Sequence, residues 1–201
     1  MRDVLLDLMR AVARGEPIDD DLDAAPGLAT ARLEGGATRQ WATDYFLGEI
    51  AHYAYAGDTL LHIAAAAYDV RLVRRIGELG ADVGARNRRD QQPLHYAVDG
   101  IPDSPSWNPS AQGETVAALL ALGADANAVD KNGTTPLLRA VRNRCALAVE
   151  VLLAGGADPH ARNKRGSTAM QLTGRTTGRG GSGTPEAREQ LRQIVELLRV
   201  R

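Results

Sequence analysis

Two short motifs recur along the chain with the same unequal spacing. The first motif, which includes the segments DTLLHIA and QQPLHYA, begins at Asp58, Gln91, Thr134 and Ser167. The second motif, Gly-Ala-Asp, begins at Gly80, Gly123 and Gly156. From Gln91 onward, copies of the first motif are separated by 43 and then 33 residues, and the three copies of the second motif are separated by the same two distances. Both motifs therefore show the same ten extra residues at the same place in the chain. Two markers with one spacing indicate a repeated structural unit, and a period of this length predicts a solenoid of stacked units.

Each unit carries the signals for two helices and a turn. A residue suited to positive φ comes just before the first helix, at Gly57, Asp90, Gly133 and Gly166. Threonines at positions 59, 135 and 168 can cap that helix, and Pro93 and Pro136 occupy its first turn, where a missing N–H costs nothing. The glycine of the second motif is expected to end the second helix.

The pattern G-x-T-P-L-H-x-A, two helices, Gly-Ala-Asp and a polar hairpin resembles the ankyrin repeat. The resemblance covers residues 57–201 and implies an all-α solenoid of helix-turn-helix units with short hairpin fingers. We expect four repeats over residues 57–89, 90–132, 133–165 and 166–201. Residues 26–56 are predicted to form a degenerate first repeat, and residues 1–25 a capping helix followed by an acidic linker.

The two ends of a solenoid need caps, because an open terminal repeat would leave its packing face in water. The apolar spacing predicts a helix over Arg2–Arg14 and another over residues 37–50, where Trp41, Tyr45, Leu47 and Ile50 would share one face. A final helix over Pro185–Val200 is expected to cap the other end. The acidic run at residues 19–23 is interpreted as a solvated linker that could shield a basic surface.

Two insertions interrupt the repeats. The first, over about residues 100–113, contains Pro102, Pro105 and Pro109, which are expected to exclude helix. It also contains Trp107, which either folds back on the repeats or forms an exposed anchor for a partner. The second, over about residues 174–184, spells G-x-G-x-x-G, but no strand precedes it, so a dinucleotide site is not predicted.

The sequence offers no constellation for catalysis or metal binding. The single cysteine, Cys145, excludes an internal disulfide and a thiolate cluster, and fits a reducing cytoplasm. His62 and His95 occupy the histidine position of the repeat and are interpreted as structural, whereas His52 and His160 lack ligand companions. We therefore expect a cytoplasmic, monomeric protein of the small bacterial ankyrin type that is not an enzyme, has no cofactor and no metal, and does not enter a membrane.

In proteins that the chain resembles, partners bind the finger tips and the exposed face of each first helix. Carried over residue by residue, the partner-binding residues predicted here are Arg86, Arg88, Arg89, Gln91, Asp99, Trp107, Lys131, Asn132, Thr134, Arg142, Asn143, Arg162, Lys164, Arg165 and Arg175. This set is strongly basic, although the formal net charge of the chain is only −1.

A basic surface of this kind predicts an acidic partner protein, because arginine binds carboxylates through paired hydrogen bonds. Such a scaffold could regulate a partner enzyme. One alternative is nucleic-acid or small-anion binding through the arginine-rich fingers and the glycine-rich loop, although the pI of about 6.4 is low for this role. Another alternative is a small-ligand protein or an enzyme built around the two insertions.

Overall fold

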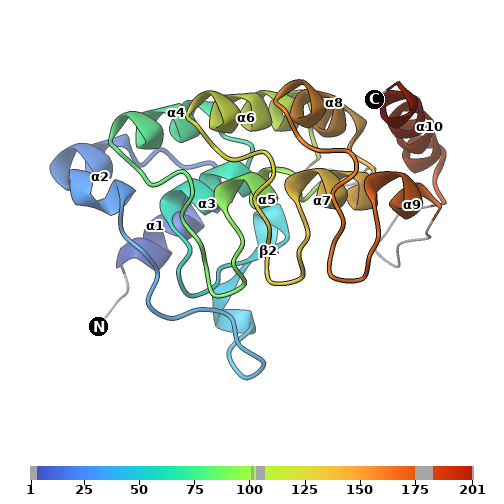
Figure 1. The fold of residues 1–201 in the computed structure, drawn as a ribbon. Helices are drawn as coiled ribbons and strands as arrows, with labels where there is room; N and C mark the ends of the chain where they lie inside the picture. Colours follow the sequence, from blue (N-terminus) through green and yellow to red (C-terminus); the bar gives the residue numbers. More distant parts are fainter. Residues whose placement is uncertain (1–3, 101, 103–106, 175–182, 201) are drawn as a thin grey trace.

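The computed structural model describes residues 4–100, 102, 107–174 and 183–200, and these residues form two layers of helices with loops along one edge (Figure 1). The inner layer contains α3 (Leu60–Ala66), α5 (Pro93–Ala97), α7 (Pro136–Asn143) and α9 (Ala169–Thr173). The outer layer contains α4 (Val70–Glu78), α6 (Pro109–Ala121), α8 (Ala146–Ala154) and α10 (Pro185–Arg199). Each helix contacts the next one in its own layer. The predicted all-α stack of helix pairs is confirmed.

The turn chemistry predicted from the repeat defines the helix boundaries. Gly57, Asp90, Gly133 and Gly166 all have positive φ, as do Gly80, Gly123 and Gly156 after the outer helices. Two positions that depart from the repeat pattern still form a cap. At Gln92, which replaces threonine, the backbone N–H donates a hydrogen bond to Nδ1 of His95 in α5 at 3.2 Å. Gln171 replaces histidine in α9, and its Oε1 accepts a hydrogen bond from the Thr168 N–H at 3.0 Å.

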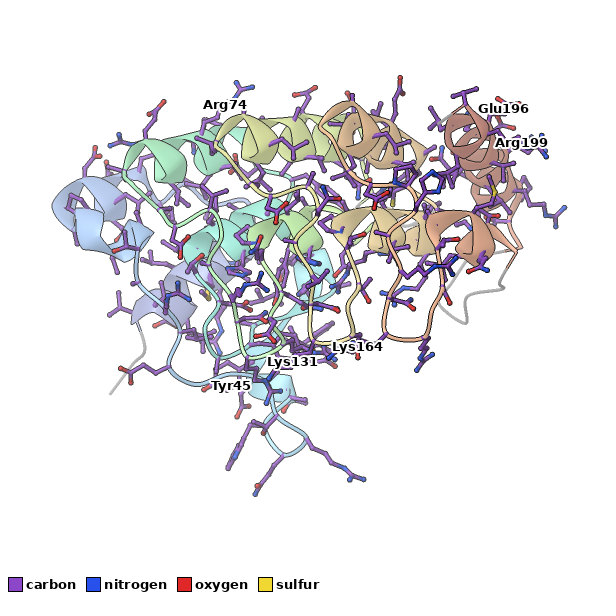
Figure 2. The ribbon with its side chains drawn as sticks, viewed as in Figure 1. Tyr45, Arg74, Lys131, Lys164, Glu196 and Arg199 are labelled. Atoms are coloured by element: carbon purple, nitrogen blue, oxygen red, sulfur yellow. The ribbon has the colours of Figure 1, made fainter. Side chains whose placement is uncertain are left out.

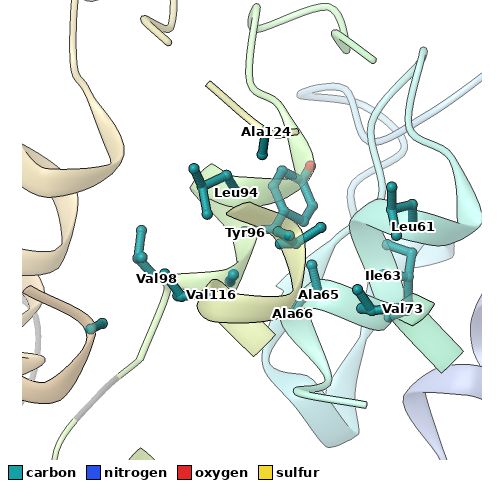
Figure 3. Close-up of a cluster of buried hydrophobic side chains, with 14 of the residues drawn as sticks. Leu61, Ile63, Ala65, Ala66, Val73, Leu94, Tyr96, Val98, Val116 and Ala124 are labelled. Carbon is teal, nitrogen blue, oxygen red and sulfur yellow. The ribbon is translucent and has the colours of Figure 1, made fainter. Parts of the chain in front are cut away.

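Small and medium-sized apolar side chains fill the space between the layers. Figure 3 shows one such cluster, in which Ile63 and Ala65 of α3 and Val73 of α4 pack near Leu94 and Tyr96 of α5. All five of these side chains are completely buried, and Val73 and Tyr96 come from adjacent repeats. Aromatic residues make up only 4% of the chain, and because alanine and leucine dominate this core, the helices can approach closely in thin layers.

The N-terminal residues form a helix pair that continues both layers. Helix α1 (Val4–Ala13) packs against α3, and α2 (Asp19–Ala24) lies beside α4. Asp19 forms an ion pair with Arg71 at 2.8 Å, and Asp23 forms one with Arg75 at 2.5 Å. The interpretation of residues 19–23 as a linker that could shield the finger surface is therefore wrong. Asp19 lies in the first turn of α2, where the helix favours negative charge, and Asp19 and Asp23 both pair with arginines of the outer layer.

The segment after α2 is not the helix predicted for residues 37–50. A 3₁₀ turn at Pro26–Ala29 precedes an extended stretch, and two more 3₁₀ turns follow at Thr43–Tyr45 and Gly48–Ile50. Between and after them, β1 (Phe46–Leu47) and β2 (His52–Tyr53) pair antiparallel, with Phe46 opposite Tyr53. Gly48 interrupts the apolar spacing, and a glycine inside a short segment disfavours helix. The repeat boundaries given above stay a prediction.

The insertion between α5 and α6 is shorter than predicted, because α6 already begins at Pro109. Proline is tolerated at the first position of a helix, and Asn108 caps this one by accepting a hydrogen bond from the Ala111 N–H at 3.1 Å. Most of the glycine-rich insertion, residues 175–182, lies outside the described residues. No helix in the described part of the chain is long and apolar enough to cross a membrane.

Candidate functional site

The fingers, which are the hairpins joining each outer helix to the next inner helix, form a continuous edge. In the second finger, Oδ1 of Asn87 accepts hydrogen bonds from the N–H groups of Arg89 and Gln91, at 2.8 and 3.1 Å. Asp130 and Asn163 make the same turn in the third and fourth fingers. Backbone hydrogen bonds then join neighbouring tips, from Lys131 N–H to Arg89 O and from Lys164 N–H to Asn132 O, both at 3.0 Å. The tips are therefore held in fixed order along one edge of the molecule.

The first finger carries a large insertion at its tip. In the second finger only Arg88 and Arg89 separate the turn residues Asn87 and Asp90. Leu33 and Gly57 take those two places in the first finger, since the Leu33 N–H donates to Asp58 O at 2.8 Å and the Gly57 N–H to Leu33 O at 2.7 Å. Residues 34–56 thus replace a two-residue tip, and we call them the arm. In Figure 1 the arm includes the pale blue loop below the fingers and the β2 strand beside α5.

The arm is anchored to the inner helices through a buried charge cluster. The Nε2 atom of His52, in β2, lies 3.1 Å from the carboxylate of Asp99, and its ring lies 4.2 Å from the ring of Tyr96. The guanidinium of Arg139, in α7, donates two hydrogen bonds to the same carboxylate at 2.6 and 2.7 Å. Asn143 donates a third hydrogen bond to Asp99 at 3.0 Å. One carboxylate therefore joins the arm to α7.

The charges of this cluster stabilise one another. Burial alone would raise the pKa of Asp99, but the attraction of Arg139 and the hydrogen bond from His52 outweigh it and hold the pKa well below its usual range. Burial alone would lower the pKa of Arg139, but the attraction of Asp99 and the hydrogen bonds to it together outweigh burial and raise the pKa. The side chains of Asp99 and Arg139 are only 9% and 8% exposed, so the pair is part of the folded interior.

Several of the predicted partner-binding residues are consequently not available to a partner. Asp99 and Asn143 belong to the charge cluster. Gln91 and Thr134 are buried, and their carbonyl oxygens accept hydrogen bonds from Nε2 of His62 and His95, at 3.2 and 3.0 Å. A single repeat cannot reveal these contacts, because each partner comes from another unit. These four predictions are corrected.

The other predicted residues divide into three groups. Trp107 is partly buried and folds back: its Nε1 donates to Gln112 Oε1 at 3.1 Å, so the structure favours the packed alternative. Arg86 and Arg162 are exposed but bind backbone carbonyls of the fingers, Arg142 is partly buried, and Arg175 lies outside the described residues. The exposed remainder consists of Arg88, Arg89, Lys131, Asn132, Lys164 and Arg165.

Sequence reasoning missed the aromatic surface of the arm. The chain has two Trp, five Tyr and one Phe, and five of these eight lie in the arm. Trp41, Phe46 and Tyr53 are 54%, 44% and 38% exposed, which is unusual for side chains of this size. The density of aromatic residues around positions 41–55 was the available signal, but the predicted helix assigned Trp41 to a packed face and gave no role to Phe46 or Tyr53.

The arm and the second finger enclose a small open cavity. Its volume is about 310 Å³, and its lining consists of Ala37, Thr38, Ala42, Tyr53, Tyr55, Arg88 and Arg89. Both guanidinium groups lie over the ring of Tyr55, at 5.2 Å for Arg88 and 4.8 Å for Arg89. Arg88 also donates to the carbonyl of Ala37, and Arg89 to the hydroxyl of Tyr55. The cavity therefore brings two cations together with the exposed ring of Tyr53 and the partly buried ring of Tyr55.

Comparison with known proteins decides the family. The family model described as "Ankyrin repeat" matches residues 56–88, and the model described as "Ankyrin repeats (many copies)" matches residues 119–172. The chain is an ankyrin-repeat protein. One relative, ankyrin repeat and SOCS box protein 6 of Mus musculus, is 40% identical over 83 residues. That match covers 41% of this chain but only 18% of the mouse protein.

Ankyrin repeats generally mediate interactions between proteins, and ankyrin-repeat proteins are typically not enzymes. In this ankyrin-repeat protein, burial raises the pKa of the Cys145 thiol to about 12, so the thiol is not a nucleophile at neutral pH. His62 and His95 are both completely buried and cap α3 and α5. Within the described residues there is no group of three or more His, Cys, Asp and Glu side chains that could hold a metal ion.

The buried histidines predict that this ankyrin-repeat protein loses stability in mild acid. Burial, followed by the charge of Arg139, lowers the pKa of His95 from 6.5 to about 4. The unfolded chain therefore binds the additional proton first, and folding stability falls as the pH decreases from 6.5 towards 4. For His95 alone the loss approaches about 3 kcal/mol. Urea denaturation at a series of pH values measures this dependence.

The variant His95→Gln is the matched test, because Gln171 forms the equivalent cap in α9. We expect His95→Gln to remain folded and to show a shallower decline in stability between pH 6.5 and pH 4. An unchanged slope would contradict the assignment of that decline to His95. The pKa of His62 is lowered in the same direction by burial, so part of the decline should persist in the variant.

Proposed function

We propose that the protein is a non-enzymatic binding module that holds an acidic surface of a partner protein along its finger tips. The observation that carries this proposal is the basic ridge, which we define as Arg88, Arg89, Lys131, Lys164 and Arg165. All five side chains are exposed, and the hydrogen-bonded tips hold them in one row. Lys131 and Lys164 lie at the lower ends of the fingers in Figure 2, above the loop of the arm.

Among the described residues, the positive charges of the basic ridge are not neutralised by carboxylates, unlike those of several other arginines in the chain. Arg71, Arg75 and Arg139 each pair with a carboxylate. Within the described residues, none of the five ridge side chains has a carboxylate within ion-pair distance. A row of unpaired cations on a nearly neutral chain favours association with an acidic surface, both by attraction at long range and by selection against basic partners.

The inner face of the stack contributes less to this proposal than the sequence predicted. The arm covers part of it near α5, and Asp99 and Arg139 neutralise each other there. Binding is therefore assigned to the tips rather than to the faces of the first helices. Control of a partner enzyme, a cytoplasmic location and a monomeric state belong to the same proposal.

The test compares two pairs of charge reversals that change the net charge equally. In Lys131→Glu/Lys164→Glu the ridge is reversed at its centre. In Arg74→Glu/Arg199→Glu the changes lie on exposed positions of the outer helices, on the opposite side of the molecule (Figure 2). Proteins captured from lysate by each form are quantified by mass spectrometry.

We expect the ridge variant to capture at least about tenfold less partner protein than the wild type at low salt, and the outer-face variant to capture as much as the wild type. The reason is that the effect of an exposed charge is local and is screened by salt. A loss that is equal in both variants would indicate a general charge effect. Capture that persists in the ridge variant would contradict the proposed function.

Nucleic-acid binding is the weaker alternative. Tyr55 does lie beside two arginines, but its neighbours Phe46 and Tyr53 pack against each other at 4.8 Å rather than presenting free parallel faces for bases to stack on. Retention of a single-stranded oligonucleotide in a low-salt gel shift would support this alternative.

A further inference from the structure

We infer that the cavity between the arm and the second finger is a specific pocket for a peptide segment that presents a carboxylate side chain next to a large apolar side chain. The inference rests on the proposed function and refines it, because it names the part of an acidic partner that determines specificity. It depends on three features of the cavity, namely its paired guanidinium groups, its exposed rings and its rigid walls.

The paired guanidinium groups are the expected binding site for the carboxylate. Arg88 and Arg89 are adjacent in sequence, and both are held against the ring of Tyr55. Each donates one hydrogen bond inside the molecule, to Ala37 O and to the Tyr55 hydroxyl, so further N–H groups of each fork remain without a partner among the described residues. Both guanidinium groups line the same cavity, and neither has a carboxylate partner among the described residues. An entering carboxylate would supply the missing negative charge and accept paired hydrogen bonds.

The exposed rings are the expected site for the apolar side chain. Tyr53 lines the cavity directly and contacts Phe46 at 4.8 Å and Tyr55 at 6.4 Å between ring centroids. Trp41 is more than half exposed on the same arm. Aromatic residues and arginine are the residue types most enriched at the centre of protein interfaces, and here they adjoin one another. Solvent-exposed rings that follow one another on an anchored loop indicate a surface that a partner covers.

The walls of the cavity are fixed from both sides before a peptide arrives. On one side, the Ala37 N–H donates to Ala54 O at 2.8 Å and the Ala54 N–H to Tyr45 O at 2.9 Å, which closes the arm on itself. On the other side, the Arg88 N–H donates to Ala56 O at 2.7 Å and joins the arm to the second finger. A site that is ordered in advance loses less conformational entropy on binding, so a short segment can be recognised.

A selection from a library of random short peptides tests the inference, with Arg89→Gln and Arg165→Gln as matched variants. Arg165 occupies the same place in the fourth finger that Arg89 occupies in the second, so both variants remove one cation from an equivalent tip. Only Arg89 borders the arm. We expect the wild-type protein to enrich peptides with Asp or Glu next to an aromatic or large aliphatic residue.

Fluorescence anisotropy with one enriched, labelled peptide then measures the affinity. The expected result is about a tenfold loss with Arg89→Gln and a change within about twofold with Arg165→Gln, since a charge-assisted hydrogen bond is lost only in the first. Tyr53→Ala should weaken binding severalfold, whereas Met170→Ala, which removes a side chain of similar exposure from α9, should not. Replacing the peptide carboxylates by amides should abolish measurable binding.

Four results would overturn the inference. These are the absence of enriched peptides, an equal loss with Arg89→Gln and Arg165→Gln, a phosphoserine peptide that binds more than about tenfold tighter than its glutamate counterpart, and displacement of the peptide by a single-stranded oligonucleotide.

The ridge variant Lys131→Glu/Lys164→Glu separates this inference from the proposed function. If that variant binds the peptide normally but still captures its partners, the proposed function fails and the pocket stands. If no peptide is selected but the ridge variant loses its partners, the pocket fails and the proposed function stands.

Discussion

Replacing Asp99 with alanine is expected to lower the free energy of unfolding by about 3–5 kcal/mol, because it leaves the guanidinium of Arg139 buried without its charge partner. The two groups form two hydrogen bonds and are each less than one-tenth exposed. The loss of the His52 contact adds to the effect by releasing β2 from α5. Urea denaturation followed by circular dichroism measures the change.

Two further variants show whether the cost arises from the isolated charge. The double variant Asp99→Ala/Arg139→Leu should recover part of the stability, because Ala66 and Leu172 occupy the corresponding positions in other repeats. Asp82→Ala removes an ion pair with Arg32 at the surface and should cost less than about 1 kcal/mol. If Asp99→Ala were as mild as Asp82→Ala, the charge cluster would not be the anchor described here.

The variant Gly36→Ala is expected to open the arm while leaving the helical stack folded. A Cβ atom at this position would lie 2.2 Å from the backbone nitrogen of Ala56 and 2.5 Å from the carbonyl carbon of Tyr55, and backbone atoms cannot move aside as a flexible side chain can. The segment around Gly36 and the segment around Tyr55 must therefore move apart, which costs about 1–3 kcal/mol locally and displaces Tyr55 from the two arginines. Binding of the selected peptide should fall by at least about tenfold.

Limited proteolysis provides the direct measurement for Gly36→Ala, since trypsin can cleave after the exposed Arg39 in a released arm. We expect cleavage at Arg39 to become about tenfold faster, with an unchanged helical circular dichroism signal. Gly27→Ala is the control, because a Cβ atom there has no neighbour within 4 Å. Equal cleavage rates in the two variants would show that the arm tolerates the added methyl group.

The helical stack was predictable from sequence because its determinants are local. The capping threonines, the prolines in the first turn and the glycines of positive φ act within a few residues of one another, and each repeat presents them again. The substitutions at Gln92 and Gln171 did not disturb the prediction, since in both repeats the N–H of the residue before the helix still donates to a side chain three positions further on.

The arm was not predictable because its conformation depends on distant residues. His52 is fixed by Asp99, and Tyr55 by Arg88 and Arg89, none of which is a sequence neighbour. The same reasoning explains the errors at Gln91 and Thr134, whose carbonyl oxygens are bound by histidines of the preceding repeat. The finger-tip cations were identified correctly as exposed because polar hairpin tips have few partners elsewhere in the chain.

In a solenoid each unit normally contacts only its immediate neighbours, so the ends can fray one unit at a time. The link from His52 through Asp99 to Arg139 departs from that rule, because it connects a segment that precedes α3 with α7, which lies beyond both α3 and α5. The units of the N-terminal half therefore cannot unfold one at a time unless the contacts among His52, Asp99 and Arg139 break first. The protein gains a longer cooperative block at the end of the stack where the pocket is built, and recognition and resistance to local unfolding are located in the same part of the chain.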